Sequence, residues 1–160
     1  MQNKNLVYLL VVLILIGGVF YFKSNNKKDV EVVVPTAPEI TYTNASADLI
    51  TVDLPYPGAV TGKEFSVIGK ARGYWFFEAS FPLELLDKDG NQIAQGHAEA
   101  QPDPVTGEVN WMTEDFVPFK GELKAPLSYI GPATLVLHKD NPSDLREHDA
   151  SISFPIVVEY

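Results

Sequence analysis

The chain has 160 residues, no cysteine and a formal net charge of −9 at pH 7. The charge is unevenly spread, because residues 1–28 carry four lysines and no acid, whereas residues 29–160 carry all 21 acidic residues against eight basic ones. The lack of cysteine excludes disulfides, thiolate catalysis and thiolate zinc sites, and the acidity of residues 29–160 argues against nucleic-acid binding.

An uncharged apolar run, LVYLLVVLILIGGVFYF, occupies residues 6–22. A helix of this length is about 25 Å long, which is at the short end of what spans a bilayer. The run is longer than the apolar core of a typical secretion signal, and the first small-x-small triplet begins only at Ala45, too far away for cleavage. We therefore predict an uncleaved membrane anchor over residues 1–28, in which lysines flank the apolar helix.

Residues 29–47 are predicted to be a linker. They contain Pro35 and Pro38 and show little periodicity, apart from a short β-prone run at 30–34. Such a composition is typical of a semi-extended spacer. The linker would hold residues 48–160, which are enough for one domain of ordinary size, off the membrane.

Residues 48–160 show no helical periodicity of useful length. They contain short alternating runs of polar and apolar residues, separated by proline, glycine, asparagine and aspartate. Seven runs are found, at residues 50–54, 64–72, 75–85, 93–100, 116–123, 133–139 and 151–160. About seven short strands in a domain of this size predict an all-β fold, a two-layer β-sandwich.

The stretch GYWFFEASFPLELLD, residues 73–87, places four aromatic residues before one glutamate. If the stretch is a continuous strand, Trp75 and Phe77 point into the core together with the apolar residues at 81, 83 and 85. Tyr74, Phe76 and Glu78 then lie on the opposite face, where core packing does not explain them. We predict that these three residues form a partner-binding patch, in which the rings give contact area and the carboxylate selects a basic partner.

Other interpretations of this stretch stay open. Glu78 on an exposed strand face can simply be solvated, or its carboxylate can accept backbone hydrogen bonds and fix a neighbouring loop to the sheet. A carbohydrate-binding module is the alternative from another class of function. Its aromatic platform would consist of Tyr74, Phe76 and Trp111, provided that these rings are exposed.

No catalytic or metal-binding motif is found. His97, His138 and His148 are scattered, and no H-E-x-x-H, Gly-x-Ser-x-Gly or phosphate-binding glycine loop occurs. The sequence DKDGNQ at 87–92 has its glycine in the wrong place for a calcium loop, so it predicts a hairpin turn. The acidic loop at 139–149 is interpreted as solvated. We therefore expect a non-enzymatic protein with no cofactor and no metal.

Four pieces of sequence together resemble a known family. They are ITVDLPYPGAV, FSVIGKARGYWFFEASFPLELLDKDGNQIAQGHAEA, the phenylalanine-rich DFVPF, and SISFPIVV, at residues 50–60, 65–100, 115–119 and 151–158. In this order and spacing they make residues 49–160 similar to the immunoglobulin-like domain of bacterial spore germination proteins. The resemblance implies an exported, immunoglobulin-like β-sandwich without enzymatic activity that contacts proteins or other components of the cell envelope.

The side of the membrane on which the domain lies is the point where the charges and the resemblance disagree. Only Lys4 and the amino terminus precede the apolar run, whereas three lysines follow it, so the positive-inside rule favours a cytoplasmic domain. The resemblance implies export. We expect a single-pass protein of the cell membrane whose extracytoplasmic domain binds an envelope protein.

Overall fold

The computed structural model describes residues 38–160, which contain nine β-strands and two short 3-10 helices. The strands are β1 (Thr41–Thr43), β2 (Ile50–Leu54), β3 (Val60–Thr61), β4 (Glu64–Arg72), β5 (Ser80–Asp87), β6 (Gln92–Ala100), β7 (Phe116–Lys124), β8 (Gly131–His138) and β9 (Ser151–Val158). The helices are η1 (Gly73–Trp75) and η2 (Arg146–His148). The anchor predicted at residues 6–22 lies outside the described residues. Among residues 38–160, no helix has the length and apolar character needed to span a bilayer.

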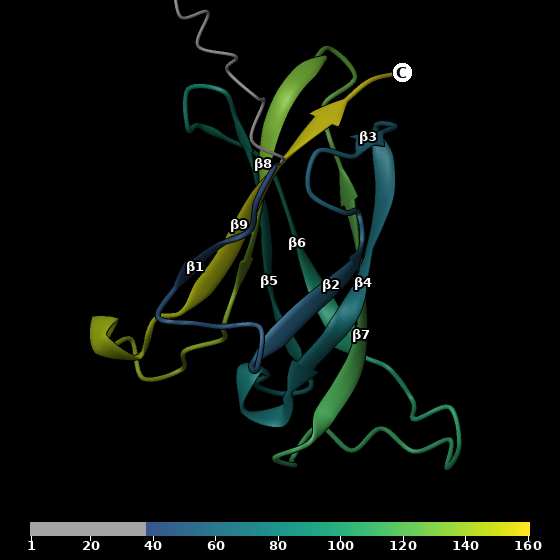
Figure 1. Cartoon of the computed structure of the whole chain (residues 1–160), viewed down its shortest axis with the longest axis vertical. Coiled ribbons are helices and arrows are strands. Elements are labelled where there is room, and N and C mark those ends of the chain that lie inside the picture. Colours follow the sequence, from purple (N-terminus) through teal and green to yellow (C-terminus); the bar gives the residue numbers. More distant parts are fainter. Residues whose placement is uncertain (1–37) are drawn as a thin grey trace, which may run out of the picture. The chain divides into compact units, whose positions relative to one another are not determined.

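The strands join into one curled sheet, in the order β1-β9-β8-β5-β6-β7-β4-β2 (Figure 1). Neighbouring strands are antiparallel, except that β3 pairs with β9 in parallel. The prediction of an all-β fold is confirmed. The seven strands of five or more residues correspond in order to the seven predicted runs, and β1 and β3 are additional short strands.

The connection between β2 and β3 shows how strongly the sheet curls. β2 pairs with β4 at one edge of the sheet, whereas β3 pairs with β9 near the other edge. Val60 follows Leu54 by only six residues, which span at most about 20 Å of extended chain. The two edges must therefore approach each other, and the inner face of the curled sheet encloses the core.

Buried and exposed side chains alternate along β4 and β9, as the sequence predicts, and the buried ones contribute to this core. Val67 and Ala71 of β4 are fully buried, and so are Ile152 and Phe154 of β9, while Lys70 of β4 is exposed. Phe81 of β5 lies among three further aromatic rings. Its ring is 6.5 Å from Trp75, 5.2 Å from Phe76 and 4.9 Å from Phe119, measured between centroids, and each pair is edge to face. This is a favourable geometry for aromatic pairs.

The prediction of a continuous strand over residues 75–85 is wrong at its beginning. Residues 73–75 form η1, and a tight turn at 77–80 precedes β5. Trp75 is buried as predicted, but Phe76, which was expected to point outward, is only 5% exposed, whereas Phe77, expected in the core, is 43% exposed. The two assignments are reversed because the chain is not extended here and strict alternation does not apply.

β1 lies inside the stretch that was predicted to be a linker, residues 29–47. Thr41 to Thr43 pair with residues 151–153 of β9, and the Asn44 side-chain amide donates a hydrogen bond to the carbonyl oxygen of Asp149 at 3.0 Å. The domain therefore begins before residue 48. A strand of three residues offers too little alternation to be recognised from sequence.

Candidate functional site

Residues 77–80 form a two-residue turn at the predicted patch. Phe77 and Ser80 exchange both backbone hydrogen bonds, at 3.0 and 3.1 Å. The two residues between them have positive φ angles, 49° at Glu78 and 63° at Ala79, as a type I′ turn requires. Asparagine and glycine are favoured at these positions, because the left-handed conformation costs a residue with a Cβ about 1–2 kcal/mol. The turn is therefore strained, and the buried aromatic residues on either side of it hold it in place.

The turn projects side chains into solvent. Phe77 and Glu78 are exposed on it, and Tyr74 of η1, close by in the chain, is 49% exposed. Of the hydrogen bonds formed within residues 38–160, none reaches the Glu78 carboxylate, so the interpretation that Glu78 fixes a loop lacks support. The structure thus exposes two members of the predicted patch, Tyr74 and Glu78. It buries the third, Phe76, and exposes Phe77 instead.

Two long loops pack against the segment that carries the turn. The backbone N–H of Gly73 donates to the carbonyl of Asp115 at 3.2 Å, and the N–H of Asp140 donates to the carbonyl of Trp75 at 3.1 Å. Only glycine fits at position 73, because a Cβ there would lie 2.1 Å from the carbonyl oxygen of Thr113. We call residues 73–79, 101–115 and 139–150 together the loop end. Figure 1 shows these connections gathered at one end of the curled sheet.

The described chain begins and ends toward the opposite end of the domain (Figure 1). Pro38 lies against Gly58, and the Gly58 N–H donates to the carbonyl of Pro155 at 2.7 Å. Tyr160 follows Val158, which pairs with Gly131 at the start of β8. Both Pro38 and Tyr160, the two ends of the described chain, therefore lie away from the loop end.

The loop end combines apolar exposure with negative charge. Its large exposed apolar side chains are Tyr74, Phe77, Val105, Val109, Met112 and Leu145. It carries nine carboxylates and two basic side chains, which makes −7 of the −13 on residues 29–160. Toward the opposite end lie the segments 55–63, 88–91 and 125–130, whose only charged residues are Lys63, Lys88 and Asp89. Exposed apolar side chains are found there too, among them Tyr56, Val60 and Leu127. Apolar exposure alone does not distinguish the two ends, but the charge does.

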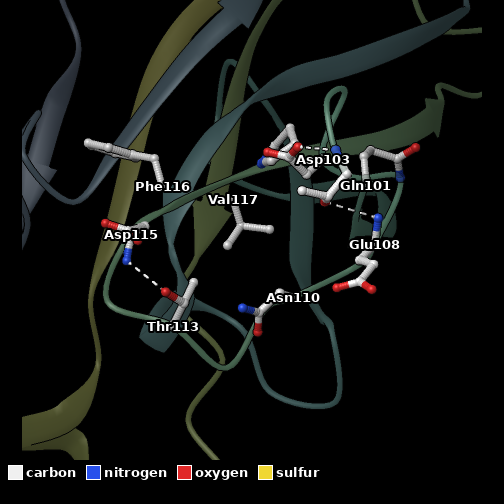
Figure 2. Close-up of a pocket in the computed structure, with 10 residues that line it drawn as sticks. Gln101, Asp103, Glu108, Asn110, Thr113, Asp115, Phe116 and Val117 are labelled. Atoms are coloured by element: carbon white, nitrogen blue, oxygen red, sulfur yellow. Dashed lines mark hydrogen bonds between the residues drawn. The ribbon is translucent and has the colours of Figure 1, made fainter.

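A hollow of about 240 Å³ lies beside the loop that connects β6 to β7. Figure 2 shows its lining side chains around an open space, with Asp103, Glu108 and Asp115 on the loop and Phe116 and Val117 at the start of β7. Carboxylates and apolar groups thus line the same space. Such a lining suits an aliphatic chain that ends in a positive charge, as in lysine and arginine.

Backbone hydrogen bonds fix the Asp103 carboxylate in this loop. It accepts hydrogen bonds from the N–H groups of Val105 and Thr106, both at 2.8 Å. These bonds favour the charged form, and the bond from Thr106 contributes most to lowering the pKa of Asp103 below its ordinary value. A further bond from the Asp115 N–H to the Thr113 hydroxyl orders the end of the loop (Figure 2).

The three histidines are not brought together. His138 Nε2 lies 3.0 Å from a carboxylate oxygen of Glu84, and His148 Nδ1 lies 3.0 Å from the hydroxyl of Ser143. Within residues 38–160, no group of three histidine or acidic side chains is placed to hold a metal ion. The hairpin turn predicted at 87–91 is confirmed, with Gly90 at a φ of 83°. There the Asp87 carboxylate accepts the N–H of Asn91 at 2.8 Å.

Tyr74, Phe76 and Trp111 do not form the exposed aromatic platform that a carbohydrate-binding module would need. Phe76 is buried, and Trp111 is half-buried and packed against the core. Of the three rings, only that of Tyr74 is broadly exposed. The exposed groups beside it are Phe77 and carboxylates, a mixed surface that is more typical of protein contacts.

A sequence model of the immunoglobulin-like domain of bacterial spore germination matches residues 49–145, which is more than half of the chain. The chain belongs to this family. The resemblance predicted from the sequence is confirmed, although the match ends before β9 rather than at Tyr160. Within this immunoglobulin-like domain, the match includes the strained turn and the hollow. No curated protein and no solved structure matches the chain.

Proposed function

We propose that this chain is a non-enzymatic binding protein, whose immunoglobulin-like sandwich presents its loop end to a protein of the cell envelope. The observation that carries the proposal is the turn at 77–80, where a strained backbone exposes an aromatic ring directly beside buried aromatic residues of the core. Residues held in sparsely populated conformations cluster at functional sites, because folding alone selects against them. An exposed aromatic side chain on such a turn gives a large contact area at low cost in conformational entropy.

The arrangement of the loops supports the same proposal. Binding residues are often carried by loops that a rigid scaffold positions, and variable immunoglobulin domains bind through loops at one end of the sandwich. In this domain the β4–β5, β6–β7 and β8–β9 connections supply the loop end, and backbone hydrogen bonds from Gly73 and Asp140 join them. The surface is therefore pre-formed, which reduces the entropy lost on binding.

The proposal includes a membrane anchor at residues 6–22 and an extracytoplasmic domain. Protease added to intact cells with a permeable outer layer should remove residues 29–160 from the membrane. Protection until the membrane is lysed would place the domain in the cytoplasm, as the lysines after the apolar run favour.

Binding through the loop end is tested by purifying the full chain with a C-terminal tag from its own membranes. A double variant, Tyr74→Ser with Phe77→Ser, should recover its envelope partner much less efficiently than the unsubstituted chain. Tyr56→Ser is the matched control, because Tyr56 is an exposed aromatic residue away from the loop end. Equal recovery by all three proteins would contradict the proposal.

A further inference from the structure

The charge of the loop end is not balanced within the domain. The four ion pairs formed among residues 38–160 are Lys88 with Asp89, Lys120 with Glu122, Lys124 with Glu64, and His138 with Glu84, which is charged only when the histidine is protonated. All four lie outside the loop end. The two basic residues of the loop end, Lys139 and Arg146, form no ion pair with the described residues. The guanidinium of Arg72, directly before the loop end, donates to the backbone carbonyl oxygens of Asp48 and Glu114, at 2.9 and 3.1 Å, and adds one positive charge at its edge. Within the described residues, none of the nine loop-end carboxylates has an ion-pair partner.

Apolar side chains stand among these carboxylates. Met112 is 78% exposed, and Tyr74 and Phe77 are close to half exposed. Gly73, next to Tyr74, packs against the backbone of Trp111 and Thr113, which brings Met112 and Tyr74 into the same neighbourhood. Protein-binding surfaces commonly surround aromatic residues and methionine with a polar rim.

We propose, on the basis of the proposed function, that the loop end recognises a basic segment of its partner that also carries an apolar side chain. The apolar side chain packs on Tyr74, Phe77 and Met112. Lysine or arginine residues on either side of it face Glu78 and the carboxylates of the other two loops. One basic side chain enters the hollow, with its aliphatic stem against Val117 and its charged head at one of the carboxylates that line the space.

Charge complementarity distinguishes this occupant from others. An acidic surface repels nucleic acid and acidic protein segments, and like charges placed face to face strongly disfavour wrong partners. The hydroxyl groups of an uncharged glycan can donate hydrogen bonds to single carboxylates, but an uncharged glycan gains nothing from the net negative charge of the surface. The geometry therefore points to a cationic protein segment, whose association is steered by the field and weakens as salt is added.

The test uses the full chain in nanodiscs of phosphatidylcholine, which carries no net charge, and three fluorescent twelve-residue peptides. The first peptide has four lysines around two tryptophans, the second has glutamate in place of each lysine, and the third has serine in place of each tryptophan. Fluorescence anisotropy gives each Kd at low and at high salt. The first peptide should bind at least about tenfold more tightly than the other two, and its Kd should rise several-fold between about 50 and 300 mM NaCl.

Variants locate the binding. Phe77→Ser and Glu78→Gln should each weaken binding of the first peptide about fivefold or more, and Glu78→Gln should also reduce its salt dependence. Glu108→Gln removes a carboxylate from the hollow and should weaken binding in the same direction. Tyr56→Ser and Glu159→Gln are the matched controls away from the loop end, and they should leave the Kd unchanged. Circular dichroism confirms that each variant is folded.

Several outcomes would overturn the inference. Equal binding of the lysine–serine peptide, with no loss in the Phe77→Ser variant, would show a general attraction to an acidic domain. Preference for the glutamate peptide, or no binding of the first peptide, would show that the partner segment is not basic. Binding of an uncharged chitin oligosaccharide that Phe77→Ser abolishes would replace the protein partner with a glycan. If the partner-recovery experiment still depends on Tyr74 and Phe77 while the peptide test fails, the proposed function stands and only the basic partner is lost.

Discussion

The ring of Phe76 packs edge to face against the ring of Phe81, with 5.2 Å between centroids and 66° between the ring planes. The next residue, Phe77, turns away and is exposed. Two adjacent phenylalanines thus have opposite environments, one in the core and one on the surface. The change happens because the strained turn at 77–80 follows directly.

This relationship predicts unequal costs for two alanine substitutions. Phe76→Ala should lower the free energy of unfolding by about 3–5 kcal/mol, as the loss of a buried phenylalanine ring usually does. Phe77→Ala should cost less than about 1 kcal/mol, because Phe77 is 43% exposed and lies outside the core cluster. Chemical denaturation of both variants measures the difference. A larger loss for Phe77→Ala would mean that the register around the turn is wrong.

The positive φ angle of Ala79 predicts a stabilising substitution. Ala79→Gly should relieve about 1–2 kcal/mol of left-handed strain and lose about 0.5–1 kcal/mol through the greater flexibility of the unfolded chain. The net effect should be a stabilisation of about 0.5–1 kcal/mol. Ala94→Gly in β6 is the control and should destabilise the domain, since no strain is relieved there. Both changes can be read from urea unfolding midpoints, and destabilisation by Ala79→Gly would refute the strained turn.

The hairpin between β5 and β6 predicts a pH dependence. The side-chain amide of Asn91 first, then backbone N–H groups and Lys88, hold the pKa of Asp87 below its ordinary value. A carboxyl group with a lowered folded-state pKa stabilises the fold above its unfolded pKa, and this contribution is lost as the pH falls through the folded pKa. Asp87→Asn should therefore lower the Tm at pH 7. The gap between the two proteins should shrink as the pH falls from about 5 to about 2.

The control for this experiment is Asp53→Asn in β2. No hydrogen bond within residues 38–160 reaches the Asp53 side chain, so Asp53→Asn should lower the Tm at pH 7 much less than Asp87→Asn does. A gap for Asp87→Asn that stays constant or widens on acidification would contradict the role assigned to the Asp87 carboxylate.

Metal removal should leave the domain intact. Asp87 is the first residue of DKDGNQ, the stretch that was compared with a calcium loop. Its carboxylate already accepts hydrogen bonds from the N–H groups of Asp89 and Asn91, both at 2.8 Å. We therefore expect the same Tm with and without excess EDTA. A clear drop after chelation, reversed by added calcium, would show a metal site that these contacts do not account for.

The longer strands could be predicted from the sequence, because one face of each is buried and apolar residues therefore recur at every second position. In β9 the pattern SISFPIVV places Ile152, Phe154 and Ile156 in the core, as its alternation requires. Two short strands could not be predicted in this way. β1 and β3 have three and two residues, and both depend on pairing with β9, more than ninety positions further along the chain.

The candidate site could be predicted only in part, for a physical reason. Tyr74 and Glu78 were identified because a core does not explain them, but the turn between Phe77 and Ser80 carries Glu-Ala instead of a turn sequence such as Asn-Gly. Without that signal the sequence pattern predicts that the alternation continues through the turn, which assigns Phe76 to the surface and Phe77 to the core. Met112 and the hollow lie in an irregular loop, where no periodicity indicates which side chains face solvent.

Site-specific photo-crosslinking in living cells tests the binding role of the loop end most directly. A photoreactive phenylalanine analogue is placed at position 77 of the full chain in one strain, and at position 56 in another as the exposed control. Illumination should yield a discrete crosslinked envelope protein from position 77, with a yield that falls when Glu78→Gln is added, and no such product from position 56. The same product from both positions, or none from position 77 in cells that contain the folded protein, would contradict recognition through the loop end.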